Sequence, residues 1–139
     1  MTTTPKEMLK DLYWSFHAKY DNQTAFNESL LEYNTRLLKP KPKLEKIVFE
    51  ETKIAVLFLA YEESTDDELE KIIVLETTNP KGFTLSELMF SINNKVVENP
   101  TDGIDISEQD AMFFEGLEYL TDDVPGYPQT KVYYMILGS

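Results

Sequence analysis

The residues of this chain that could do chemistry are almost all carboxylates. The sequence holds 25 Asp and Glu residues against 13 Lys and Arg, one histidine and no cysteine. The lack of cysteine excludes disulfides, thiolate zinc sites and cysteine nucleophiles, and a single histidine excludes a multi-histidine metal cluster. We expect that histidine, His17, to be a half-exposed residue of a helix and not a catalytic base.

A pair of facing carboxylates is the enzymatic chemistry that this composition leaves open. Glycosidases use two carboxyl groups roughly 5–10 Å apart. Glu115 is the most suggestive residue because it lies between Phe114 and Gly116 in an apolar stretch, where burial would raise the pKa of its carboxyl. Alternation along a strand turns Glu115 outward when Phe114 points inward, and we favour that arrangement. No catalytic residue is predicted.

Signatures of other sites are missing from the sequence. The patterns G-x-S-x-G, G-x-x-x-x-G-K-[ST] and G-x-G-x-x-G do not occur, so no hydrolase elbow, P-loop or dinucleotide turn is predicted. A calcium loop with Gly103 at its sixth position would have Pro100 at the third and Gln109 at the twelfth, which excludes an EF-hand. We predict no metal site and no cofactor. A weak calcium site stays open as an alternative at Asp102, Asp105 and Glu108.

The net charge of −12 is the strongest global property of the chain. Residues 1–46 hold 8 basic and 6 acidic groups, whereas residues 47–139 hold 5 basic and 19 acidic groups, a net charge of −14. Such a field repels nucleic acid and anionic membranes and attracts a basic protein, although solubility alone is an alternative explanation. The contact groups predicted for a basic partner are Glu62, Glu63, Asp66, Asp67, Glu68, Glu70, Asp122 and Asp123.

Two amphipathic helices are predicted in the first 38 residues. Thr4-Pro5-Lys6-Glu7 has the pattern of a capping box with proline at the first helical position, and apolar residues then recur at helical spacing as far as Tyr20. The second helix covers residues 23–38. It ends before the proline-rich segment 39–43, which we interpret as a solvated connection and not as a phosphate site.

The core is predicted around a strand at residues 54–61. Eight apolar residues follow Lys53 without interruption, so both faces of this segment should be buried. Strands at residues 44–51 and 69–77 flank it through short turns, which predicts an antiparallel meander. We expect helices or a second layer on each side of this strand. The substitution Leu57→Asp should then unfold the domain, since an unpaired buried charge costs several kcal/mol.

One more helix and two strands complete the prediction. Thr84-Leu85-Ser86-Glu87 is a second capping box, and the helix that it begins covers residues 85–98. Strands follow at residues 112–120 and 131–137. The predicted fold class is α+β, a single domain over residues 1–139. It has a single antiparallel sheet of about five strands packed with three helices, in the order α-α-β-β-β-α-β-β.

The cellular location is predicted from absences. The first residues lack a basic and apolar leader pattern, and no apolar run reaches the roughly 18 residues that a membrane-spanning helix needs. We expect a cytoplasmic protein that does not enter a membrane.

Two resemblances bear on function. The element order resembles that of the small acidic chaperones of bacterial type III secretion. The size, the acidity and the lack of cysteine and of catalytic motifs resemble the immunity proteins of bacterial polymorphic-toxin and contact-inhibition systems. The segments Gly82-Phe83-Thr84-Leu85-Ser86-Glu87-Leu88 and Phe113-Phe114-Glu115-Gly116-Leu117 are similar to stretches in uncharacterised bacterial proteins of this size. The expected function is a non-enzymatic immunity-type inhibitor that neutralises a basic toxin. A secretion-type chaperone and a small carboxylate-dependent enzyme are the alternatives.

Overall fold

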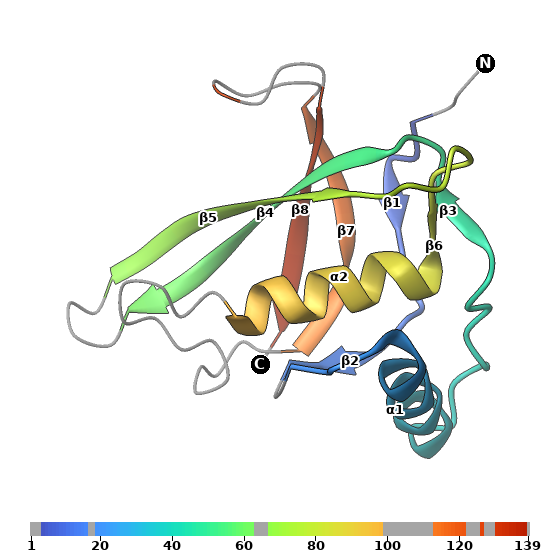
Figure 1. Ribbon diagram of the computed structural model, residues 1–139. Helices are drawn as coiled ribbons and strands as arrows, with labels where there is room; N and C mark the ends of the chain where they lie inside the picture. Colours follow the sequence, from blue (N-terminus) through green and yellow to red (C-terminus); the bar gives the residue numbers. More distant parts are fainter. Residues whose placement is uncertain are drawn as a thin grey trace.

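The computed structural model describes residues 4–16, 19–62, 67–98, 113–121, 126 and 130–138 and has an α+β fold (Figure 1). Two long hairpins and two helices account for most of it. The elements in chain order are β1 (Glu7–Met8), β2 (Trp14–Ser15), α1 (Gln23–Arg36), β3 (Ile47–Phe49), β4 (Lys53–Glu62), β5 (Asp67–Glu76), β6 (Phe83–Thr84), α2 (Leu85–Glu98), β7 (Phe113–Thr121) and β8 (Lys131–Gly138).

The main sheet is mixed, so the prediction of one antiparallel sheet is wrong. Its strand order is β1-β7-β8-β4-β5, and β2 also pairs with β7. The hairpins β4–β5 and β7–β8 are each antiparallel, but they meet through β4 and β8, which run in the same direction. The predicted interior position of residues 54–61 is confirmed, because β4 lies between β5 and β8. Apolar residues on both sides of a strand are typical of such parallel neighbours.

The first strand of the predicted meander belongs to a second, small sheet. The short turn at residues 51–53 predicted that β3 pairs with β4. Instead, β3 pairs antiparallel with β6. Gly82 allows this contact, because its φ is +111° and a Cβ atom there would collide with the backbone oxygen of Phe49. Only glycine lets two backbones approach so closely in this conformation.

The predicted first helix, residues 5–20, does not exist in the structure. The N-terminal segment is extended, and its two short strands lie antiparallel to β7, with Met8 opposite Leu117 and Trp14 opposite Phe114. The apolar residues of this segment explain the error. Its buried apolar residues, which are Met8, Leu12, Trp14 and Phe16, are all even-numbered. Spacings of four fit one face of a helix and also one face of a strand.

The two later predicted helices are confirmed, and each begins at a residue whose side chain caps it. Asn22 caps α1 by accepting a hydrogen bond from the backbone N–H of Ala25 at 2.8 Å, and Thr84 caps α2 by accepting one from the backbone N–H of Glu87 at 3.0 Å. The carboxylate of Glu87 does not complete the capping box and accepts a hydrogen bond from the Thr77 hydroxyl instead. No helix in the described part of the chain is long and apolar enough to cross a membrane.

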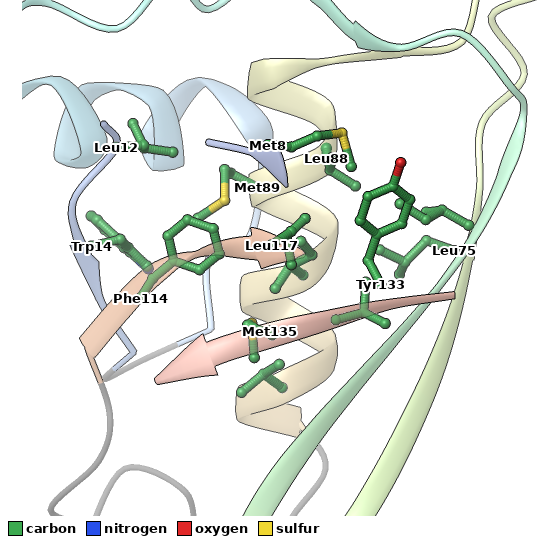
Figure 2. Packing of buried hydrophobic residues seen from close by; sticks show 14 of the residues in the cluster. Met8, Leu12, Trp14, Leu75, Leu88, Met89, Phe114, Leu117, Tyr133 and Met135 are labelled. Carbon is green, nitrogen blue, oxygen red and sulfur yellow. The ribbon is translucent and has the colours of Figure 1, made fainter. Parts of the chain in front are cut away.

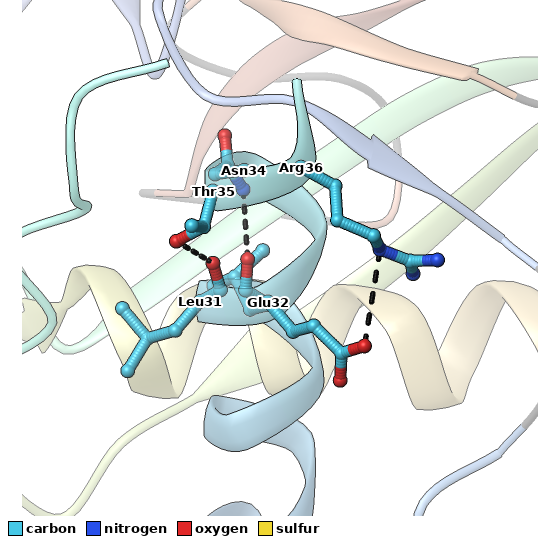
Figure 3. Close-up of polar contacts among 6 residues, drawn as sticks. Leu31, Glu32, Asn34, Thr35 and Arg36 are labelled. Carbon is cyan, nitrogen blue, oxygen red and sulfur yellow. Dashed lines mark hydrogen bonds and ion pairs between the residues drawn. The ribbon is translucent and has the colours of Figure 1, made fainter. Parts of the chain in front are cut away.

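The last turn of α1 is held by side chains that bond back along the helix (Figure 3). Thr35 donates to the carbonyl of Leu31 at 2.8 Å, and Arg36 lies 3.8 Å from the carboxylate of Glu32. The helix ends at Arg36, two residues before the predicted end, and Leu38 then takes a φ of +57° with 93% of its surface exposed. Leu38 therefore does not extend the apolar face of the helix.

The core lies between the main sheet and the two helices, which cover the same side of that sheet (Figures 1 and 2). Ile54, Val56 and Phe58 point into it and are almost fully buried. Leu57 and Leu59 alternate with them onto the opposite side and are only half-buried. The expectation of cover on each side of β4 is therefore wrong for the part of the chain that the structure describes, and Leu57 is not a core residue.

Candidate interaction surface

Four of the acidic residues predicted to bind a partner lie in β4 and β5, toward the end of their hairpin. Glu62 is opposite Asp67, Glu68 is opposite Tyr61, and Glu70 is opposite Leu59. Glu70 is exposed. Of the remaining predicted contact residues, Glu63, Asp66, Asp122 and Asp123 lie outside the described residues.

The structure does not bring the end of β7 to this hairpin end. Thr121, the last described residue of β7, is opposite Val132. Val132 in turn is beside Ala55, close to the start of β4, whereas the hairpin end is at Glu62. The described end of β7 and the end of the β4–β5 hairpin therefore lie near opposite ends of β4.

The structure describes some of the residues that were considered for catalysis or metal binding. Glu115 is exposed, which confirms that it points outward, and its carboxylate lies over Gly138. Within the described ranges, no three His, Cys, Asp or Glu side chains gather as metal ligands would. Three described grooves each have a single carboxylate in their lining, from Asp11, Glu32 or Glu76. His17, Asp102, Asp105 and Glu108 lie outside the described residues.

A largely apolar surface covers the side of the main sheet that faces away from the helices, which we call the outer face. Its middle residues, Leu57, Leu59 and Tyr134, are half-buried, and the smaller Ala55 and Val132 are fully buried. Alternation along the strands assigns to this face the apolar residues Ala55, Leu57 and Leu59 of β4, Ile72 and Val74 of β5, and Val132, Tyr134 and Ile136 of β8.

One row of residues crosses the outer face from edge to edge. Ile72 is opposite Leu57, and Leu57 is beside Tyr134. Tyr134 is opposite Glu118, and Glu118 is opposite Glu7. The row is therefore apolar on β5, β4 and β8 and acidic on β7 and β1.

The acidic end of this row places two like charges directly opposite each other. Cross-strand partners of the same charge repel. Lys10 compensates one of them, since its ammonium lies 3.2 Å from the Glu118 carboxylate. Glu7 is exposed, and no described cation lies within 4 Å of its carboxylate. This corner of the outer face thus carries a negative charge that is not neutralised within the described chain.

Carboxylates also border the apolar strip elsewhere. On β5, Glu76 pairs with Lys53 at 3.4 Å, whereas Glu70 has no described cation within 4 Å. On β7, Glu115 likewise has none. The described acids of the outer face are Glu7, Glu70, Glu76, Glu115 and Glu118, and its described bases are Lys10 and Lys53.

The sheet beneath this surface is held rigidly on its core side. Tyr133 is fully buried, packs edge-on against Phe49 and Tyr119, and donates a hydrogen bond of 2.6 Å to the backbone oxygen of Pro5. Burial raises the pKa of the Tyr133 hydroxyl, and the neighbouring Tyr119 and Glu51 raise it further. The neutral hydroxyl thus fastens the N-terminal segment to β8.

Among the described acids of the outer face, one is a contact residue predicted from the sequence. Glu70 was predicted, but Glu7, Glu76, Glu115 and Glu118 were not predicted as contact residues. A usable signal for two of them is Gly116, because a glycine inside a strand pattern indicates a β-bulge, and a bulge between Glu115 and Glu118 puts these two acids, three residues apart, on the same face. Glu7 could not be found this way, because its segment has the spacing of a helix.

Comparison of the chain with protein-family models, curated proteins and solved structures finds no match.

Proposed function

We propose that this chain is a non-enzymatic protein-binding domain that binds a basic protein partner through its outer face. The observation that carries the proposal is the row from Ile72 through Leu57 and Tyr134 to the opposed carboxylates of Glu118 and Glu7. An apolar strip beside unneutralised carboxylates fits a partner surface with apolar residues flanked by lysine or arginine.

The two parts of the outer face make different contributions to binding. Removing half-buried apolar side chains from water supplies a favourable free energy that offsets the entropy lost on association. The carboxylates act at longer range, because opposite charges raise association rates from about 10⁵–10⁶ to as much as 10⁸–10⁹ M⁻¹s⁻¹ at low salt. A basic side chain between Glu7 and Glu118 also relieves their repulsion, so part of its binding energy comes from a strain already present in the free protein.

The finer form of the proposal is an immunity-type inhibitor that neutralises a basic toxin. The net charge of −12, the lack of cysteine and the lack of catalytic motifs support it. An inhibitor of this kind needs no chemistry of its own, only a surface that covers the partner's site.

A secretion-type chaperone is the second candidate, and the apolar part of the outer face supports it. A chaperone uses such a surface to hold an unfolded segment or to pack against a second copy of itself. The two candidates differ in the state of the partner. An inhibitor binds a folded toxin, whereas a chaperone binds the segment only while it is unfolded.

The test begins with capture of a partner from an extract of the source organism, followed by kinetics with the purified partner. The triple variant Glu7→Gln/Glu70→Gln/Glu115→Gln removes three charges of the outer face that have no described cation within 4 Å. We expect it to lower the association rate constant at low salt by at least tenfold and to abolish most of the salt dependence.

A matched control removes the same charge elsewhere. Glu28, Glu45 and Glu50 are exposed and are not among the acids assigned to the outer face, so Glu28→Gln/Glu45→Gln/Glu50→Gln should bind nearly as the unmodified protein does. Equal effects of the two triple variants would contradict the assignment of the outer face. An association rate that does not depend on salt would contradict the choice of a basic partner.

A further inference from the structure

A groove of about 340 Å³ lies between the turn that follows β1 and the proline-rich segment 39–43. Its volume is at the lower end of the range for small-molecule sites, roughly 300–1,000 Å³. It is lined by residues of four separate parts of the chain, including the start of α2. The sequence predicts that segment 39–43 is a solvated connection, but in the structure this segment forms one wall of the groove.

The floor of the groove is apolar. Leu12 and Leu85 are 4% and 8% exposed, and Val48 beside them is half-buried. These side chains belong to the core or pack against it, so the floor is part of the folded structure and not of a loose loop. A short hydrocarbon group placed on them would leave water without any change in the core.

The wall of the groove is fastened at both ends. At one end, the Lys39 ammonium lies 4.7 Å above the centre of the Tyr13 ring, a cation–π contact. At the other end, the backbone oxygen of Lys46 accepts a hydrogen bond of 2.8 Å from the N–H of Leu85. Pro40 and Pro42 restrict the backbone between these anchors. The groove is therefore preformed to a large degree.

The cations of this wall are not neutralised. Lys41, Lys43 and Lys46 line the groove, and no carboxylate of the described chain lies within 4 Å of their ammonium groups. Lys10 also lines it but pairs with Glu118, and Asp11 is the one carboxylate of the lining. In a chain with 12 more acidic than basic residues, three unpaired lysines around one groove create a local field opposite to the overall charge.

We infer that this groove binds a small amphipathic anion. Its anionic head group, a carboxylate or a phosphate, lies among Lys41, Lys43 and Lys46, and its short apolar part covers Leu12, Val48 and Leu85. The floor of the groove favours an apolar group and its lysines favour an anion, so a ligand with both groups fits best. A purely polar anion leaves the floor in contact with water, and a neutral hydrocarbon leaves the lysines without a counter-charge. This site is independent of the proposed function, which uses a different set of residues.

The test is a titration of the full chain with octanoate, octyl phosphate and neutral 1-octanol. Binding is measured from the chemical shifts of the backbone amides by NMR. We expect saturable shifts around Leu12, Val48 and Leu85 with one of the two anions, and binding at least tenfold weaker for 1-octanol. The preferred anion identifies the head group. The variant Lys41→Gln/Lys43→Gln/Lys46→Gln should weaken anion binding about tenfold, because several exposed charge contacts are lost together.

A matched control separates local from general electrostatics. Lys6, Lys81 and Lys95 are exposed and do not line the groove, so Lys6→Gln/Lys81→Gln/Lys95→Gln makes the same change in net charge elsewhere. Equal weakening by both triple variants would overturn the inference. So would the absence of binding by both anions, or shifts centred on Leu57 and Ile136 of the outer face. The first two outcomes do not bear on the binding of a basic protein partner, because the residues that they test lie outside the outer face.

Discussion

The side chain of Asn34 in α1 bonds both backbone groups of Tyr13, accepting from its N–H at 3.1 Å and donating to its carbonyl at 2.9 Å. Asn94 in α2 does the same for Tyr20, at 3.0 and 2.8 Å. Each asparagine thus replaces the neighbouring strand that an extended backbone would otherwise need. The two helices thus hold the backbone of the N-terminal segment at Tyr13 and at Tyr20. These two residues bound the second half of the helix that was predicted over residues 5–20.

Replacing Asn34 should test this clamp. Asn34 is fully buried and also donates a hydrogen bond of 2.9 Å to the carbonyl of Leu30. The substitution Asn34→Ala leaves the backbone groups of Tyr13 without these partners, which should lower the free energy of unfolding by about 2–4 kcal/mol. Urea unfolding measures the change. Thr35→Ala, which removes an exposed hydrogen bond in the same helix turn, should cost less than about 1 kcal/mol. A similar cost for both variants would contradict the clamp.

The two faces of β4 should respond differently to a buried charge. Val56 is fully buried in the core, so Val56→Asp should leave the domain unfolded at 25 °C, since the cost of several kcal/mol compares with a total stability of about 5–15 kcal/mol. Leu57 lies half-buried on the outer face, and Leu57→Asp should leave the domain folded with a lower melting temperature. Circular dichroism during heating distinguishes the two. An unfolded Leu57→Asp variant would show that the outer face is covered.

The hydroxyl of Tyr133 should make stability fall at high pH. Its pKa is raised in the folded state by burial, so above the unfolded value of about 10 the unfolded chain loses the proton while the folded chain keeps it. The contribution of this group is fully present below pH 10 and is lost as the pH rises further. Tyr133→Phe should cost about 1–2 kcal/mol near pH 7, because the carbonyl of Pro5 loses its donor. Its unfolding free energy should then decrease less steeply between pH 10 and 11 than that of the unmodified protein.

Two glycines allow a matched comparison of backbone strain. Gly82 and Gly126 both have positive φ, at +111° and +92°, but a Cβ atom at Gly82 would collide with the backbone of Phe49, whereas one at Gly126 would meet nothing within 4 Å. Gly126→Ala should therefore cost only the conformational strain, about 1–2 kcal/mol. Gly82→Ala should cost more, because β3 and β6 must also separate. Equal melting temperatures for the two variants would contradict the close approach of β3 and β6.

The repulsion between Glu7 and Glu118 should be measurable without a partner. Glu7→Gln removes one of the opposed charges and keeps the ion pair of Lys10 with Glu118. We expect the free energy of unfolding to rise by roughly 0.2–1 kcal/mol at low salt and to rise less at 1 M salt, where charges are screened within about 3 Å. A decrease in stability would show that Glu7 is already neutralised in the free protein.

Much of the candidate surface could not be predicted, for a physical reason. The negative charge of Glu70 and of the acids before it is evident from the sequence, because these residues are close together in the chain. The row from Ile72 to Glu7 joins residues of five strands, and its members become neighbours only through strand order and register. Periodicity within a segment carries no information on which strand lies beside it.

The sequence by itself determined the elements whose stability is local. Helix α2 begins and ends where its cap and apolar spacing predict, α1 follows the cap at Asn22, and the long strands β4, β5, β7 and β8 lie within two residues of their predicted bounds. In these segments the propensities, the caps and the apolar period all favour one structure, so no distant contact is needed to choose.

Only the tertiary structure decided the first twenty residues and the direction of the sheet. The apolar residues from Met8 to Phe16 fit a helix and a strand equally, and the choice came from β7 beside them and from the side chains of Asn34 and Asn94. The parallel contact of β4 with β8 likewise arises where two hairpins meet, more than seventy residues apart in the chain. A backbone hydrogen bond depends on position and not on residue type, so partners at this distance leave no pattern in the sequence.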